Sequence, residues 1–267
     1  MNDAPIGVFD SGIGGLTVAK AMMASLPEES ILYFADTARF PYGEKTPDTI
    51  RSYAAQIIRF LKSRGAKAVA IACNTATAHA LKFAQDRFDL PVIGIIKPGA
   101  RAACEATKNR RVGVIATQGT VDSGIYIDEI HQLDPGIEVV QQACPPFVTY
   151  AEQGRWYDKE VKDMIKDYLG VIKEFDSDTL VLGCSHFPLL KDAIAEEMGE
   201  RVQLIYPEFE MMHELTGILR EKGLLASGTV PEYRYFTSAE EEYSNAPACR
   251  ALGRDDIRFE RIEIDRY

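Results

Sequence analysis

Short apolar runs alternate with longer segments of helical spacing along most of the chain, a pattern typical of a parallel α/β fold. In the first hundred residues, four runs predict buried strands at 6–9, 31–34, 66–72 and 91–96. Helical spacing predicts helices at 16–26, 46–64 and 78–88. The segment 35–45 is predicted to be a loop, and Lys97-Pro98-Gly99 is expected to end the fourth strand.

The same order of elements then recurs, which indicates an internal duplication. Strand patterns at 112–115, 137–140, 179–182 and 202–206 follow their counterparts at nearly constant spacing. We therefore expect an α/β fold of two similar doubly wound, mainly parallel-sheet domains, with a ligand cleft between them. A helix at 211–222 and strands at 233–237 and 257–264 are expected to return to the first half. The predicted domains are 1–97 plus 208–267, which is discontinuous, and 98–207.

Each half carries a cysteine at the end of its third strand, directly before a helical pattern. Cys73 precedes Asn74 and Thr75, and Cys184 precedes Ser185 and His186. Ligands of open α/β sheets bind at the carboxyl ends of the strands, so the two thiols would face one cleft. One thiolate could remove a proton from a carbon while the other thiol supplies a proton on the far face, because a thiol pKa of about 8.5 leaves both forms accessible.

Other interpretations of this pair remain open at this stage. Free cysteines are often buried as small apolar side chains, and two cysteines can also form a redox pair. Metal binding would need further ligands, and only His186 lies close in sequence. Cys104, Cys144 and Cys249 give no pattern of their own and are expected to be ordinary buried thiols.

A glycine-rich turn follows the first strand at 12–15. It differs from nucleotide-binding glycine motifs, because Thr17 replaces the last glycine and no Gly-Lys-Ser/Thr follows. Asp10 would repel a phosphate but could face an ammonium group, while Ser11 and the turn amides could hold a carboxylate. Alternatively, Asp10 only caps the following helix. Glu152, considered alone, predicts a solvated charge.

Composition narrows the class of protein. The 267 residues carry a net charge of −10 without a basic run, which argues against nucleic acid as the main ligand. The first residues lack the features of a signal peptide, and no apolar stretch approaches the roughly 20 residues of a membrane span. The five cysteines are an odd number without a CxxC pair, so we expect free thiols in a reducing cytoplasm.

Several motifs together resemble the cofactor-independent aspartate/glutamate racemase superfamily, and within it the glutamate racemases. The resemblance covers nearly the whole chain and follows the order of the family. It rests on the blocks 10–15, 41–43, 73–77, 113–117 and 182–189. The chain differs from the family pattern at Ser185, where Thr is usual, and at Phe187, where Tyr is usual.

The resemblance implies interconversion of L- and D-glutamate by two cysteine bases without a cofactor, Cys184 acting on the L-enantiomer and Cys73 on the D-enantiomer. It implies that Asp10 assists Cys73, that His186 assists Cys184, and that Glu152 belongs to the site. It further implies a cytoplasmic homodimer that supplies D-glutamate for peptidoglycan. The implied substrate contacts are Asp10, Ser11, Tyr42, Gly43, Asn74, Thr75, Thr117, Ser185 and His186.

Two alternatives compete with this function. The first is a racemase or isomerase for aspartate, a hydantoin or another small acid. The second is a non-catalytic binding protein, such as a regulator of a DNA topoisomerase. The paired cysteines favour an enzyme.

Overall fold

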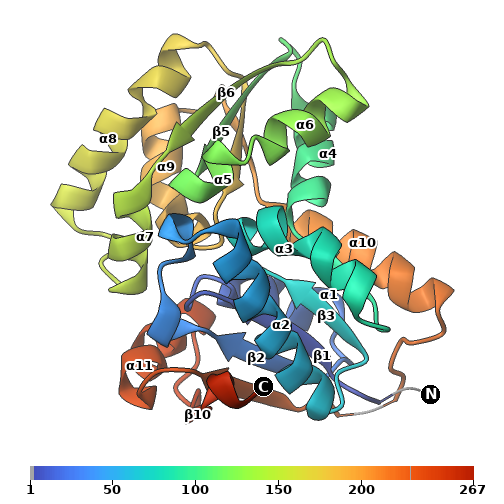
Figure 1. Cartoon of the computed structure of the whole chain (residues 1–267). Helices are drawn as coiled ribbons and strands as arrows, with labels where there is room; N and C mark the ends of the chain where they lie inside the picture. Colours follow the sequence, from blue (N-terminus) through green and yellow to red (C-terminus); the bar gives the residue numbers. More distant parts are fainter. Residues whose placement is uncertain (1–2, 229) are drawn as a thin grey trace.

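Two separate parallel β-sheets form the framework of the computed structural model, which describes residues 3–228 and 230–267 (Figure 1). Met1, Asn2 and Thr229, which fall within the predicted first domain, lie outside the described residues. The first sheet has the order β10-β9-β2-β1-β3-β4 and the second β6-β5-β7-β8. The strands are β1 (Ile6–Asp10), β2 (Ile31–Ala35), β3 (Ala68–Ile71), β4 (Val92–Gly94), β5 (Arg111–Ala116), β6 (Glu138–Ala143), β7 (Thr179–Gly183), β8 (Gln203–Ile205), β9 (Tyr233–Thr237) and β10 (Phe259–Arg261).

The two sheets share one strand order, which confirms the predicted fold class. β1 lies between β2 and β3, with β4 beyond β3, and β5 lies between β6 and β7, with β8 beyond β7. All of these neighbours pair in parallel. Every residue of β1, β3 and β7 is buried and most are apolar, as expected of strands covered on both faces.

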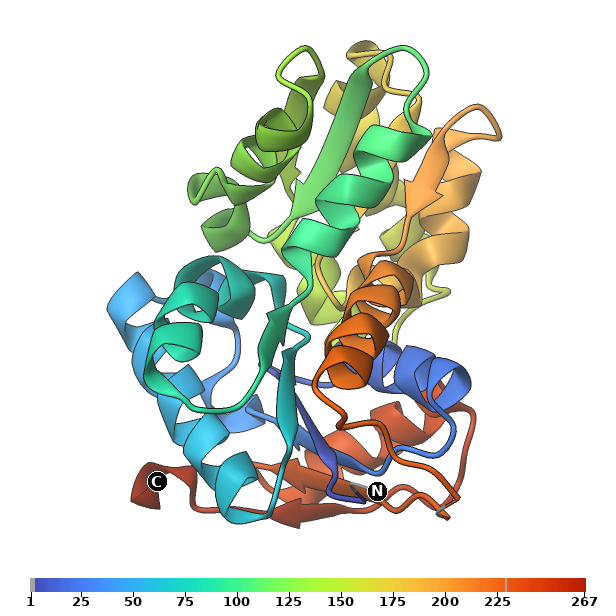
Figure 2. The same ribbon diagram turned by 90° about the vertical axis from the view of Figure 1, so that its right-hand side faces the viewer.

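The C-terminal segment extends the first sheet. β9 pairs with β2, and β10 pairs with β9 at the edge (Figure 2). We call the first sheet and its helices the first lobe, and the second sheet and its helices the second lobe. The chain passes between the lobes through α4, which follows β4, and through α10, which follows β8.

Helices cover both faces of each sheet. In the first lobe, α2 and α3 pack on one face, while α1, α10 and α11 share an apolar cluster on the other. That second cluster continues through α4 and α6 into the second lobe, so the lobes are joined by apolar packing. The helices are α1 (Leu16–Ser25), α2 (Pro47–Ser63), α3 (Asn74–Arg87), α4 (Ile96–Ala106), α5 (Gln118–Asp122), α6 (Ile125–Leu133), α7 (Pro145–Glu152), α8 (Lys159–Glu174), α9 (Lys191–Met198), α10 (Pro207–Glu221) and α11 (Glu241–Leu252).

The structure corrects several predicted boundaries. The segment 97–99 does not end a strand but lies in α4. Pro98 is tolerated there because it occupies the first turn, where a backbone N–H has no partner within the helix and its absence costs nothing. Helix α3 begins at Asn74, directly after Cys73, rather than at 78. The predicted loop contains two 3₁₀ turns, η1 (Thr37–Arg39) and η2 (Tyr42–Glu44). None of the described helices is long and apolar enough to cross a membrane.

Candidate active site

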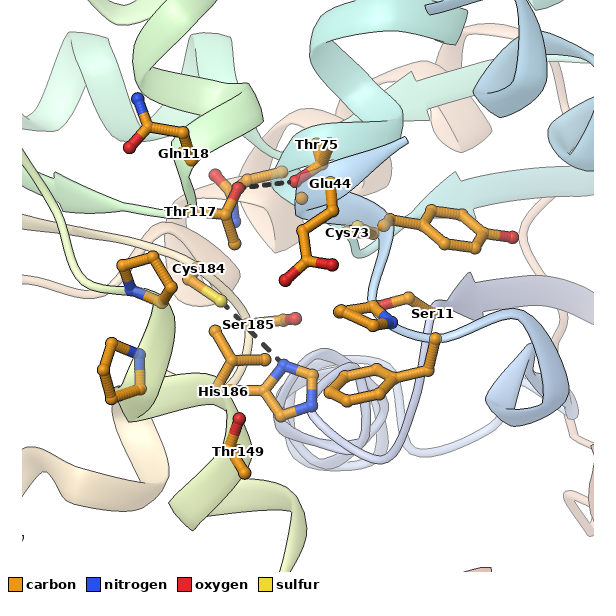
Figure 3. Close-up of a pocket in the computed structure, with 18 of the residues that line it drawn as sticks. Ser11, Glu44, Cys73, Thr75, Thr117, Gln118, Thr149, Cys184, Ser185 and His186 are labelled. Carbon is orange, nitrogen blue, oxygen red and sulfur yellow. Dashed lines mark hydrogen bonds between the residues drawn. The ribbon is translucent and has the colours of Figure 1, made fainter. Parts of the chain in front are cut away.

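A cavity of about 480 Å³ opens where the carboxyl ends of the two sheets meet. Its wall comes from both lobes, and Figure 3 shows Cys73 entering from the side of the first lobe and Cys184 from the side of the second. Ten of the predicted site residues line it, namely Ser11, Tyr42, Gly43, Cys73, Asn74, Thr75, Thr117, Cys184, Ser185 and His186. Asp10 and Glu152 lie behind this wall and contact it.

Cys73 occupies the junction between β3 and α3. Its Sγ accepts a hydrogen bond from the Ala76 amide at 3.4 Å, so the cysteine itself caps the helix. The side chain is buried, and burial raises the pKa of the Cys73 thiol well above its usual range. The charge of Asp10 raises the pKa further, while the hydrogen bond from the Ala76 amide lowers it by less than burial raises it. Cys73 is therefore a protonated thiol at neutral pH, suited to donate a proton.

Cys184 has a different environment because His186 lies beside it. The distance from Cys184 Sγ to His186 Nδ1 is 3.9 Å (Figure 3). His186 Nε2 lies 2.6 Å from Glu152 Oε2. Burial alone would lower the pKa of the His186 imidazole, but hydrogen bonds and charges from Cys184 and Glu152 outweigh it and raise the pKa well above its usual value. An imidazolium at this position presents positive charge to the Cys184 sulfur at 3.9 Å.

Glu152 fastens this arrangement to the first lobe. Both of its carboxylate oxygens lie 3.2 Å from the Ile13 backbone nitrogen, which donates to them. Its side chain is only 18% exposed, so the expectation of a solvated charge is wrong. The Ile13 amide therefore binds the Glu152 carboxylate, and it is not one of the turn amides open to a ligand carboxylate.

The glycine turn allows the close approach of the two lobes. A Cβ at Gly14 would lie 2.4 Å from His186 Nδ1, and a Cβ at Gly12 would lie 2.7 Å from the Glu152 oxygens. A Cβ at Gly15 would lie 2.5 Å from Asp10 Cβ. These contacts explain the glycines without a nucleotide, because any side chain there would displace the imidazole or the carboxylates.

Asp10 is fully buried and links the lobes. It accepts hydrogen bonds from Ser185 Oγ at 2.6 Å and from Ser11 Oγ at 3.2 Å. Burial raises the pKa of the Asp10 carboxyl, although the charge of His186 and the Ser185 hydrogen bond oppose this. The alternative that Asp10 caps α1 is wrong, since Gly15 holds the N-cap position and no side chain bonds there.

Hydroxyl groups from both lobes meet at the start of α3. Thr75 Oγ1 lies 2.8 Å from Thr117 Oγ1 and 3.2 Å from Thr120 Oγ1. Tyr126 OH donates to Asn74 Oδ1 at 2.8 Å. Thr120 and Tyr126 are not among the residues predicted from the sequence. A signal for Thr120 was the Thr117-x-x-Thr120 spacing after a strand end. This spacing is typical of a helix cap, and the Thr120 amide does donate to the Thr117 hydroxyl.

The loop before α2 contributes Tyr42 and Gly43, but not through the tyrosine hydroxyl. Tyr42 OH is hydrogen-bonded to Asp36, which also accepts from Arg39 at 2.8 and 2.9 Å and from Ser238 at 2.8 Å. The Tyr42 ring and the Gly43 backbone are therefore the parts available to a ligand.

Further residues line the cavity without having been predicted. Phe40 lies with its ring centroid 5.8 Å from that of His186, and Arg155 and Glu44 add charge to the wall. Phe187 is fully buried, packs against Phe147 at 5.3 Å and is not part of the wall.

The two matched lobes each place a thiol in one cavity, and protein side chains fill the space beside the glycine turn. A family model described as Asp/Glu/Hydantoin racemase matches residues 16–207. The chain belongs to this family and is an amino-acid racemase.

Individual relatives agree over nearly the full length. A glutamate racemase of Geobacter metallireducens is 46% identical over 235 residues, covering 87% of each chain. The structure of a glutamate racemase from Bacillus anthracis superposes with a TM-score of 0.95 at 40% identity, covering 98% of each chain. That of Francisella tularensis, solved in complex with D-glutamate, gives a TM-score of 0.92 at 37% identity and covers all of both chains.

Proposed function

We propose that this protein interconverts L- and D-glutamate by transferring protons between Cα and two cysteines, without a cofactor. The single observation that supports this most strongly is the pair of thiols at equivalent strand ends, β3 and β7, lining one cavity from different lobes. The relatives named above, at 37–46% identity, are glutamate racemases, and one of them was solved with D-glutamate.

The surroundings of the two cysteines suit the L-to-D direction, because Cys73 is a buried thiol and Cys184 lies beside His186. The Cys184 thiolate, next to the His186 imidazolium, removes the α-proton of L-glutamate; the C–H bond breaks, an S–H bond forms, and the electron pair moves onto the α-carboxylate. The Cys73 thiol then gives its proton to the opposite face of Cα and becomes a thiolate. The reverse reaction starts from that thiolate, so each cysteine serves one enantiomer.

The carbanion requires stabilisation, since the α-proton of an amino acid is far less acidic than a thiol. Donors to the α-carboxylate provide it, because the carboxylate gains charge as the proton leaves. Asn74, Thr75 and Thr117 supply such donors at the cavity wall. Asp10, behind the wall, adds negative charge near Cys73 and the substrate ammonium, and holds Ser185 in place.

The remaining parts of the proposal concern the protein in its cell. We propose that the lobes correspond to domains 1–97 plus 208–267 and 98–207, and that the enzyme acts as a homodimer in the cytoplasm. Its product would supply D-glutamate for peptidoglycan. Measurement of the molecular mass in solution tests the homodimer. Growth of a strain depleted of the enzyme, with and without added D-glutamate, tests the supply of D-glutamate for peptidoglycan.

Separate assays with L-glutamate and L-aspartate test the activity. Loss of optical rotation with glutamate, absent in the Cys73→Ser and Cys184→Ser variants, supports the proposal. Turnover of aspartate alone would replace glutamate as the substrate. Full turnover by either serine variant would contradict the two-base mechanism, and no turnover of any amino acid would favour a binding protein.

A further inference from the structure

Asn74 carries an amide group whose two ends have different surroundings. Its side chain is 2% exposed and lines the cavity. Oδ1 accepts a hydrogen bond from Tyr126 OH at 2.8 Å, whereas Nδ2 has no hydrogen-bond partner among the described residues. A buried amino group without a hydrogen-bond partner destabilises the protein by about 1–3 kcal/mol. A ligand that accepts a hydrogen bond from Nδ2 would remove this cost. The cavity is where such a ligand would lie.

Tyr126 is held rigidly where it meets Asn74. It lies in the first turn of α6 in the second lobe, is fully buried, and crosses to the first residue of α3 in the first lobe. Its ring lies 3.0 Å from the position that a Cβ on Gly183 would occupy, directly before Cys184. Its hydroxyl lies 3.5 Å from the corresponding position on Gly99. Glycine at 183 thus gives the tyrosine ring its space, whereas the distance at 99 is an ordinary packing contact.

The hydroxyl of Tyr126 keeps its proton over the whole working range of pH. Burial raises the pKa of the Tyr126 phenol far above its usual value, and the charges of Cys184 and Glu208 act in the same direction. A phenol that stays protonated can donate to Oδ1 throughout, and it thereby fixes the orientation of the Asn74 amide, with Nδ2 left for a ligand. Without it the amide could turn by half a rotation and present its oxygen, which would repel a carboxylate.

We propose that Tyr126 is a positioning residue: it orients the Asn74 amide so that Nδ2 donates to a carboxylate of the amino-acid substrate. The inference rests on the proposed function, because it takes an acidic amino acid as the ligand. It adds a role for the second lobe in forming the carboxylate site on the first lobe.

A double-mutant cycle tests this role. Tyr126→Phe should lower kcat/KM for glutamate by about 10-fold, mainly through a higher KM, since a hydrogen bond to a charged group is lost or misdirected. In the Asn74→Ala background, the same substitution should change kcat/KM by less than about 2-fold, because its target is gone. If the fold-changes of the two single variants simply multiply in the double variant, the role of Tyr126 is merely structural and the proposal is overturned.

Two further variants make the test decisive. Asn74→Asp keeps an acceptor for Tyr126 but places an oxygen toward the cavity, so it should bind glutamate more weakly than Asn74→Ala; binding equal to that of the unsubstituted protein would refute the donor role even if Tyr126→Phe fails to fold. Tyr235→Phe is the matched control, because it removes a buried phenol that has no hydrogen-bond partner in the described part of the chain and lines a different pocket from Asn74. It should leave KM unchanged.

D-glutamate binding by calorimetry separates this inference from the proposed function. If the protein binds glutamate with the predicted coupling between Tyr126 and Asn74 but does not racemise it, the positioning role stands and the activity is wrong. If it racemises glutamate and the two substitutions act independently, the activity stands and the positioning role is wrong. If it does neither, both are wrong.

Discussion

Replacing Glu152 with Gln removes one negative charge from the series of contacts that runs from the glycine turn through Glu152 and His186 to Cys184. The carboxylate receives hydrogen bonds from His186 Nε2 at 2.6 Å and from the Ile13 amide at 3.2 Å. Gln keeps the size and one acceptor oxygen but loses the negative charge. The folded protein therefore loses part of what keeps the imidazole of His186 protonated.

The size of the effect follows from these contacts. A hydrogen bond to a charged group contributes about 1.5–3 kcal/mol, and Gln retains part of it, so a loss of about 1.5–2 kcal/mol is expected. Since about 1.4 kcal/mol corresponds to one pKa unit, the pKa of His186 should fall by roughly one unit or slightly more. Above the lowered pKa, Cys184 loses its positive neighbour, and kcat/KM should fall by about 10-fold or more. At lower pH the variant should approach the unsubstituted enzyme.

The assay is the initial rate of loss of circular dichroism of L-glutamate, measured between pH 6 and 9.5. We expect the alkaline limb of the kcat/KM profile to move to lower pH in Glu152→Gln. The control is Glu196→Gln, because Glu196 pairs with Lys162 on the exposed surface of the same lobe. An equal loss of activity at every pH, or an unchanged profile, would refute the assigned role of the Glu152 charge.

Two further predictions concern the same contacts. Gly14→Ala should reduce kcat/KM by at least about 10-fold, because its Cβ would lie 2.4 Å from His186 Nδ1. The control Gly170→Ala has open space around it, so it should retain full activity and gain a little helix stability. Equal activities of the two variants would refute the packing argument. His186→Gln should lower the melting temperature at pH 6 by about 4–8 °C, from about 2 kcal/mol. The pKa of His186 is higher in the folded than in the unfolded protein, so its stabilising effect is complete below the unfolded pKa of about 6.5 and is lost as pH rises through the folded pKa. The difference in melting temperature between the two proteins should therefore shrink toward pH 10. A difference that grows with pH would contradict this.

The repeated strand pattern was sufficient to predict the fold class, because buried parallel strands are continuous apolar runs that recur in one order. It also located Cys73 and Cys184, since a cysteine directly after such a run must lie at the carboxyl end of a strand. Helix boundaries were less certain where proline is tolerated, as Pro98 shows: the same residue can end a strand or begin a helix.

Contacts between the lobes could not be predicted from local sequence. Glu152 has no motif that announces His186 or Ile13, and its burial depends on how α7 meets the glycine turn. Tyr126 likewise resembles any helix residue facing a core until α6 is placed against α3. These interactions join segments that are far apart in sequence, and only the packing of the lobes determines them.

The most direct test of the two-base mechanism is racemisation of L-glutamate in heavy water, followed at low conversion by NMR and mass spectrometry. If Cys184 removes the α-proton and Cys73 supplies a different one, the first D-glutamate formed should carry deuterium at Cα, while the remaining L-glutamate keeps its protium. D-glutamate that retains the original protium, or deuterium appearing first in the remaining L-glutamate, would show that a single group moves the proton on both faces and would contradict the mechanism.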